Sequence, residues 1–189
     1  MNDTGLIEQV ETCDIERGIA TYNNDRASAA SDLMICIEQL ANHLDSATSL
    51  EHTFVYLGAT AGMRMLNASD PIATTDVFET IKAKFVQSGL QTKRVSIITG
   101  QEEGLYAWVA VNYLSGIFFN QTNFWNQTYG VLDMGGASTQ IAHQINDTNA
   151  SADTDSLHIR LYGTNYTIHT YSNFCFGTEQ ALNRFIKQA

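Results

Sequence analysis

The chain lacks any run of 18 or more apolar residues, and its N-terminus has no basic stretch followed by an apolar core. Neither a membrane span nor a signal peptide can therefore be read from the sequence. Basic residues are also few, because 10 Lys and Arg stand against 20 Asp and Glu and leave a net charge of −10. Nothing in the sequence forms a basic patch, so neither nucleic acid nor an anionic membrane surface is expected as a partner.

Two familiar site patterns are missing as well. No G-x-x-x-x-G-K-[ST] loop occurs, which excludes a P-loop nucleotide hydrolase. The histidines have no H-x-x-x-H or comparable metal-ligand spacing, and we interpret them as surface or β-sheet residues. They are His43, His52, His143, His158 and His169.

The composition is globular, with 44% hydrophobic and 16% charged residues. A length of 189 residues fills one ordinary domain or parts of two. Asn-x-Ser/Thr sequons are more frequent than the roughly two or three expected by chance, which favours a glycosylated protein of the secretory pathway. The sequons begin at Asn2, Asn67, Asn120, Asn126, Asn146, Asn149 and Asn165.

The cysteines agree with an oxidising compartment. Cys13 and Cys36 flank a polar loop and the first expected helix. A bridge between them would close a loop of just over twenty residues and stabilise the fold by about 3 kcal/mol. The sequence has three cysteines, so a Cys13–Cys36 bridge leaves Cys175 over. One interpretation is that Cys175 is a buried free thiol.

Hydrophobic periodicity predicts helices and strands in alternation. Asp70 followed by Pro71 is typical of a helix start, with Val77, Ile81 and Phe85 on one face and a stop at Gly89. This alternation indicates an α/β fold whose sheet has mixed strand directions. The expected helices are 29–44, 71–88, 105–119 and 178–187, and the expected strands are 53–57, 95–98, 129–134, 139–143, 157–162 and 167–171.

Residues 130–142, G-V-L-D-M-G-G-A-S-T-Q-I-A, are the most informative stretch. We interpret them as a buried apolar strand that ends at Asp133, a turn at Gly135 and Gly136, and a second strand. Successive backbone N–H groups in such a turn can converge on an anion while the carboxylate holds a hydrated metal. A plain β-hairpin is the alternative, because glycine pairs are common in turns.

Two other segments favour the phosphate-binding interpretation. At 56–66, Y-L-G-A-T-A-G-M-R-M-L takes an apolar strand into a turn of small residues. At 97–114, I-I-T-G-Q-E-E-G-L-Y-A-W-V-A-V-N-Y-L places two acids between glycines at the head of a helix.

In this order, G-A-T-A-G-M-R, G-Q-E-E-G-x-x-x-W and L-D-M-G-G-A-S-T-Q resemble the apyrase signature regions of the ecto-nucleoside triphosphate diphosphohydrolase family. The resemblance continues into L-Y-G-T-N-Y-T-I-H-T-Y-S-N-F-C-F-G at 161–177, and it is greatest to the cell-surface members. Departures are small: Met134 replaces a leucine, and Tyr171 and Asn173 replace a histidine and an aromatic. The family's first region, D-A-G-S-S, should lie upstream of this chain.

The resemblance implies the two-lobed, ribonuclease-H-like fold shared with actin, incomplete in this chain. Residues 1–99 would be the later part of the first lobe, and 100–189 the opening part of the second. It also implies a disulfide partner for Cys175 beyond Ala189. Because the opposing phosphate turn is absent, we expect the isolated chain to show no measurable nucleotide hydrolysis.

The family's motifs imply a role for each site residue. Glu103 would be the general base, and Ser138 and Gln140 would hold the attacking water. Asp133 would bind Ca²⁺ or Mg²⁺, through water, whereas Glu102 is interpreted as a solvated acid of the first helical turn. Backbone donors to the terminal phosphate would come from both lobes: Thr60, Ala61, Gly135, Gly136 and Ala137.

The implied function is that of an extracellular apyrase. Such an enzyme releases the terminal phosphate of nucleoside tri- and diphosphates, ATP and ADP, by direct attack of water. It would lie on the outer face of the plasma membrane or be secreted, with any anchor in terminal segments absent here. The alternatives are a phosphotransferase of the same superfold and a non-catalytic, truncated fragment of the enzyme.

Overall fold

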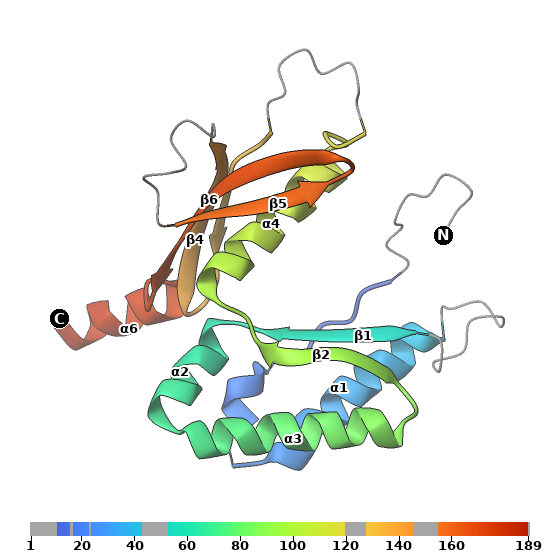
Figure 1. Cartoon of the computed structure of the whole chain (residues 1–189). Helices are drawn as coiled ribbons and strands as arrows, with labels where there is room; N and C mark the ends of the chain where they lie inside the picture. The colour runs from blue at the N-terminus through green and yellow to red at the C-terminus, as the bar shows by residue number, and fades with distance from the viewer. Residues whose placement is uncertain are drawn as a thin grey trace. The chain divides into compact units, whose positions relative to one another are not determined.

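The computed structural model divides the chain into two compact units, Met1–Ile97 and Ile98–Ala189. Figure 1 shows both units with most of their helices and strands labelled. The residues that the structure describes are 11–42 except 16 and 23, 53–119, 128–145 and 155–188.

Unit 1 is a two-stranded parallel sheet with helices packed on it (Figure 1). The strands pair from Phe54 opposite Gln91 to Ala59 opposite Ile97. Parallel neighbours need a crossover connection, and two consecutive helices supply it. In chain order the elements are η1 (Ile19–Tyr22), α1 (Arg26–Ala41), β1 (Phe54–Ala59), α2 (Ala61–Ser69), α3 (Pro71–Gln87) and β2 (Gln91–Ile97).

Local sequence signals set the ends of α3. The Asp70 side chain accepts a hydrogen bond from the N–H of Ala73 at 2.9 Å, and Pro71 occupies the first helical position. After the helix, Gly89 has φ 75, a conformation that glycine adopts at little cost. The predicted apolar face is confirmed, because the side chains of Val77, Ile81 and Phe85 are at most 1% exposed.

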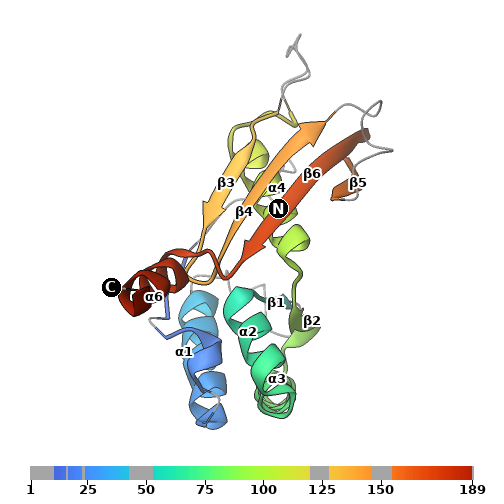
Figure 2. The same ribbon diagram turned by 90° about the vertical axis from the view of Figure 1, so that its left-hand side faces the viewer.

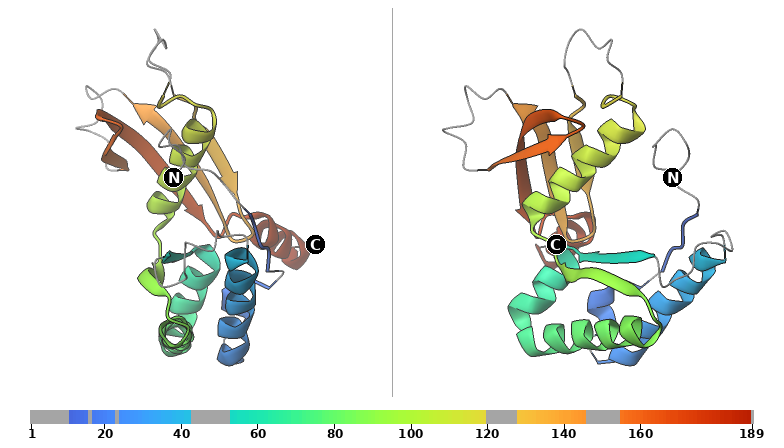
Figure 3. Two further views of the ribbon diagram at one scale, coloured as in Figure 1. Left: turned by 90° about the vertical axis from the view of Figure 1, so that its right-hand side faces the viewer. Right: turned by 45° about the vertical axis from the view of Figure 1, so that its right-hand side comes forward.

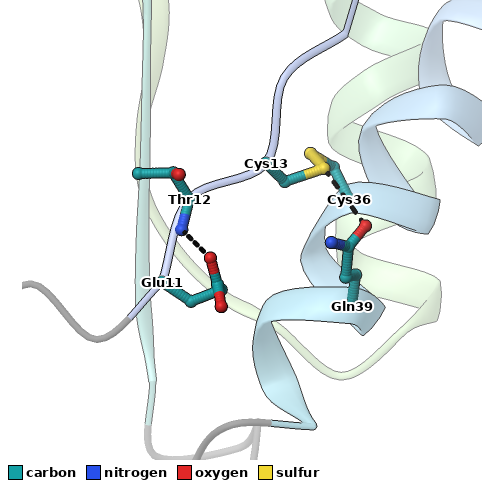
Figure 4. Close-up of a disulfide and its surroundings, with 5 residues drawn as sticks. All are labelled: Glu11, Thr12, Cys13, Cys36 and Gln39. Carbon is teal, nitrogen blue, oxygen red and sulfur yellow. Dashed lines mark hydrogen bonds between the residues drawn. A yellow bond between two sulfur atoms is a disulfide. The ribbon is translucent and has the colours of Figure 1, made fainter.

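Helix α1 contributes to the same core and is joined to the segment before it by a disulfide. It starts at Arg26, earlier than the expected 29–44, and its buried residues include Met34 and Cys36. Cys36 is bonded to Cys13, with a Cα–Cα distance of 5.6 Å (Figure 4). The bridge ties residue 13 to the body of the unit, where the amide oxygen of Gln39 lies 3.6 Å from Cys13 Sγ.

We expect the double variant Cys13→Ser, Cys36→Ser to lower the free energy of unfolding by about 3 kcal/mol, because the unfolded chain regains the entropy of an open loop. Denaturant titration measures the loss, and non-reducing peptide mapping locates the bridge. Cys175→Ser is the matched control and should leave the mapped bridge intact. Free thiols at both positions in protein made in an oxidising compartment would refute the assignment.

Unit 2 is a four-stranded antiparallel sheet in the order β3-β4-β6-β5. Strands β3, β4 and β6 lie side by side in Figure 2, with α6 beside the lower end of the β3–β4 hairpin. Figure 3 shows the yellow-green helix α4 lying across the strands. The elements are α4 (Gly100–Leu114), β3 (Val131–Met134), β4 (Ser138–Ile145), β5 (Ser156–Leu161), β6 (Thr164–Phe174) and α6 (Thr178–Gln188).

The core of unit 2 lies between α4 and one face of this sheet. Trp108 on α4 is fully buried with Ala142 of β4 and Ile168 of β6. Its ring contacts those of Phe118 and Tyr166, with centroids 5.7 and 5.5 Å apart. Alternate residues of each strand point to opposite faces, so only half of each strand takes part in this core.

Other sequence expectations also differ from the structure. The strand ending near Asp133 was expected to be buried, yet Leu132 and Met134 are 64% and 58% exposed. They alternate with the residues that face α4 and lie on the opposite side of the sheet. The helix expected to reach residue 119 ends at Leu114, and Gly116 follows with φ 72.

Surface features bear on the expected compartment. Asn67 and Asn165 are exposed, as glycosylation requires; the sequons at Asn2, Asn120, Asn126, Asn146 and Asn149 lie outside the described residues. Among the helices that the structure describes, none is long and apolar enough to cross a membrane.

Candidate functional site

The two acids at the head of α4 have different partners. Thr99 and Glu102 form a capping box: Glu102 N–H donates to Thr99 Oγ1 at 3.0 Å, and Thr99 N–H donates to Glu102 Oε2 at 2.8 Å. The Glu102 carboxylate is therefore engaged with the helix end. Glu103 instead accepts a hydrogen bond from Gln140 on the sheet. The local cap thus distinguishes the two acids.

Close packing brings the first turn of α4 onto the sheet. A Cβ atom at Gly100 would overlap the side chain of Ser172, and one at Gly104 would overlap the hydroxyl of Thr170. Thr170 Oγ1 also donates to the carbonyl of Gln101 at 3.1 Å. Glycine is needed at both positions because a larger residue would lift the helix, and Glu103 with it, from β4 and β6.

Gln140 is the centre of the candidate site. Its Nε2 lies 3.2 Å from Glu103 Oε2, 2.6 Å from Ser138 Oγ and 2.9 Å from Ser172 Oγ. The amide orientation follows from chemistry, since an oxygen placed against the carboxylate would be repelled. An amide nitrogen has two hydrogens and three neighbours here. At most two of the three neighbouring oxygens therefore accept from Nε2 at once, and each serine hydroxyl keeps its own hydrogen to donate.

The other end of the Gln140 amide has no partner. Gln140 is fully buried, and its Oε1 accepts no hydrogen bond within the part of the chain that the structure describes. Leaving a buried acceptor unsatisfied costs about 1–3 kcal/mol. Such an oxygen, beside a carboxylate and the buried hydroxyl of Ser138, can be satisfied by a donor such as a water molecule.

The glycine turn lies next to this cluster in sequence and space. Asp133 on β3 pairs with Gln140 on β4, so both side chains lie on the face toward α4. The N–H of Gly135 donates to the carbonyl of Ser138 at 3.0 Å and closes the hairpin. Gly136 and Ala137 complete the turn, and no hydrogen bond from their N–H groups is made to the residues described.

A divalent cation fits this face if water and substrate phosphate supply most of its ligands. No group of three or more His, Cys, Asp or Glu side chains comes together within the described ranges. Asp133 is half-buried, and its carboxylate makes no hydrogen bond or ion pair with another described residue. Mg²⁺ commonly uses one or two carboxylates, with water and substrate phosphate completing the shell. Asp133 suits a cation held in that way, and the chain provides no all-protein cage among the residues seen.

The remaining candidates lie in unit 1. Thr60 is the N-cap residue of α2, and its carbonyl accepts from the N–H groups of Met63 and Arg64, both at 3.1 Å. Its side chain makes no capping hydrogen bond. Ala61 follows and is 3% exposed. The structure thus brings together Glu103, Ser138 and Gln140, and it places Thr60 and Ala61 at a separate helix start.

Sequence reasoning missed Ser172. Its hydroxyl lies against Gln140, and its side chain contacts Gly100 at the head of α4. The signal was its position two residues after Thr170, on the same strand face. Periodicity alone does not reveal that two residues of β6 support the helix that presents Glu103.

The fold and this cluster define an α/β protein whose site combines a half-buried carboxylate with a buried amide and a buried hydroxyl, beside a glycine turn. The chain belongs to the GDA1/CD39 (nucleoside phosphatase) family, whose model matches residues 1–189.

Curated relatives include three mouse (Mus musculus) proteins. Ectonucleoside triphosphate diphosphohydrolase 2 is 38% identical over 100% of the chain and 39% of its own length. Ectonucleoside triphosphate diphosphohydrolase 1 is 36% identical over 96% of the chain and 37% of its length. Ectonucleoside triphosphate diphosphohydrolase 3 is 35% identical over 98% and 36%. The chain therefore spans less than two fifths of the length of these relatives.

Proposed function

We propose that this chain provides part of the active site of an apyrase-type enzyme, which hydrolyses the terminal phosphate of ATP and ADP. The observation that carries the proposal is the Gln140 amide, which joins Glu103 to Ser138 and whose buried oxygen has no donor among the described residues. Family membership supports phosphate chemistry, and the names of the relatives support nucleoside triphosphates and diphosphates as substrates.

The arrangement suits direct attack by water. A water molecule that donates one hydrogen to Glu103 and the other to Gln140 Oε1 has a lone pair left for phosphorus. As the new P–O bond forms, Glu103 takes the proton and the anhydride P–O bond breaks, so its electrons leave with the nucleotide. The glycine turn stabilises charge on the phosphoryl oxygens through the N–H groups of Gly136 and Ala137.

The metal and the second phosphate turn complete the proposal. Asp133 would hold Ca²⁺ or Mg²⁺, which neutralises adjacent phosphates when bound. In a ribonuclease-H-like, two-lobed fold, Thr60 and Ala61 would contribute donors from the first lobe. The sequons and the cystine support a location on the cell surface or outside the cell.

The function is tested in a full-length chimera, in which residues 1–189 replace the matching segment of mouse ectonucleoside triphosphate diphosphohydrolase 2. We expect it to release inorganic phosphate from ATP and ADP, with Ca²⁺ or Mg²⁺ and without any added acceptor. Dependence on a hydroxyl acceptor would favour a phosphotransferase. A folded chimera without phosphate release would contradict the proposed function.

Asp133→Ala in the chimera should raise the metal concentration needed for half-maximal activity by at least about tenfold, because the only protein ligand proposed for the ion is lost. Titration of a chelated enzyme with Ca²⁺ measures the change. Asp155→Ala is the matched control, since that carboxylate accepts from Gln101 Nε2 at 3.0 Å and is not among the groups proposed to bind the ion. An unchanged titration for Asp133→Ala would make Asp133 structural.

A further inference from the structure

The connection from β6 to α6 packs directly against the glycine turn. A Cβ atom at Gly177 would overlap three backbone atoms: the carbonyl oxygen of Gly135, the carbonyl carbon of Gly136 and the nitrogen of Ala137. Backbone atoms cannot rotate out of the way as the end of a side chain can. Any larger residue at 177 must therefore push the turn away from α6.

Hydrogen bonds fix the same contact. The N–H of Thr178 donates to the carbonyl of Gly135 at 2.9 Å, and the N–H of Glu179 donates to the carbonyl of Gly136 at 3.0 Å. Gln180 N–H reaches the same Gly136 oxygen at 3.2 Å. N–H groups in the first turn of a helix have no partner inside the helix. Those of α6 are satisfied by the turn.

This pairing decides where the turn's own donors point. In a trans peptide unit the C=O and the following N–H point in opposite directions. Because the carbonyls of Gly135 and Gly136 are directed at α6, the N–H groups of Gly136 and Ala137 are directed away from it. Two successive amides with one orientation form a concave site for an anion. The helix start thus orients the donors without contacting the anion.

Two more features hold the connection in place. Thr139 on β4 donates through Oγ1 to the carbonyl of Phe176 at 2.7 Å. Cys175 has φ 66, a region that costs a non-glycine residue about 1–3 kcal/mol. This strained residue directs Phe176 and Gly177 onto the turn. A strained backbone of this kind persists only where the surrounding structure holds it.

We propose that Gly177 and the first turn of α6 are positioning elements that preset the phosphate-binding amides of Gly136 and Ala137. The inference rests on the proposed function. Donors that are already aligned when charge develops on the phosphoryl oxygens need no reorganisation during the reaction, and this alignment is the main contribution of such sites to the rate.

The first test removes one N–H group and places a proline ring against the carbonyl that this group contacted. Thr178→Pro deletes the donor to Gly135 at the first helical position, where proline is tolerated; Thr178→Ala keeps the donor. In the chimera we expect Thr178→Pro to lower kcat/KM for ATP and weaken inhibition by inorganic phosphate, each by about tenfold. Thr178→Ala should stay within about twofold of the parent in both measurements.

Gly177→Ala tests the packing contact, with Gly130→Ala as its matched control. A Cβ at Gly130 would meet its nearest atom, His143 Cβ, at 3.4 Å, an ordinary contact. We expect Gly177→Ala to weaken phosphate inhibition by at least about tenfold and Gly130→Ala to leave it within about twofold. A merely structural defect would reduce the amount of active enzyme and leave the inhibition constant unchanged.

The outcomes separate this inference from the function on which it rests. If the parent chimera hydrolyses ATP but folded Thr178→Pro and Gly177→Ala enzymes keep the parental phosphate inhibition, the positioning role is wrong and the function stands. If the parent chimera releases no phosphate, the proposed function fails first. Should Gly177→Ala not fold, Thr178→Pro against Thr178→Ala decides alone.

Discussion

Glu103→Gln in the chimera lowers turnover by at least about a hundredfold, with little change in the apparent affinity for ATP. The amide keeps the shape of the side chain but cannot accept the proton of the attacking water. It also places a second amide against Gln140 Nε2, which now lies 3.2 Å from the Glu103 carboxylate. Steady-state phosphate release over a range of ATP concentrations separates turnover from affinity.

Glu102→Gln is the control that the structure offers for this measurement. Both acids lie in the first turn of α4, but Glu102 accepts a hydrogen bond from the N-cap residue Thr99. Glutamine can accept the same hydrogen bond in a capping box, so Glu102→Gln should leave both stability and turnover close to those of the parent. A folded Glu103→Gln enzyme with near-parental turnover would end the assignment of the general base.

Local signals account for the parts of the fold that could be predicted. Asp70, Pro71 and Gly89 define α3 because caps and turns depend on neighbouring residues, and the periodic Val77 and Ile81 lie in its core as expected. Strand positions were also predictable. Strand environments were not, because an apolar run such as that of β3 has the same letters whether one or both faces are covered. Leu132 shows this, at 64% exposed.

The candidate site was likewise predictable only in part. The motif letters single out Glu103, Ser138 and Gln140, and the structure places their side chains within one hydrogen-bonded group. Ser172 and Gly177 escaped notice because their roles arise from contacts made only after folding, against Gly100 and Gly135. Such contacts join segments far apart in sequence, and neither periodicity nor turn propensity contains them.

Gln140→Leu should lower turnover by about a hundredfold or more, the effect of displacing a reacting group by about 1 Å. Leucine has a similar volume, so the buried position stays filled. It removes the amide hydrogens that now lie against Glu103 and Ser138, and it removes the oxygen proposed to orient the water. The water can then still donate a hydrogen bond to Glu103, but it loses its second hydrogen-bond acceptor, Gln140 Oε1.

Gln144→Leu is the matched control for this change. Gln144 lies on the same strand and the same face, and its Oε1 accepts from Thr128 Oγ1 at 3.0 Å. Gln144 is not among the residues proposed to act in the site, so Gln144→Leu should retain turnover within about threefold. The stability of this variant is compared with that of Gln140→Leu. Equal losses of turnover in the two leucine variants would show that burial, not water orientation, explains the effect.

A double-mutant cycle decides whether Glu103 and Gln140 act as one unit. Groups that position and deprotonate the same water are not additive, because removing either one already abolishes their shared task. The Glu103→Gln, Gln140→Leu enzyme should therefore turn over at about the rate of the slower single variant, far above the product of the two single effects. Turnover that falls by the full product would mean that the two side chains act independently, and the hydrogen bond between them at 3.2 Å would then have no part in the reaction.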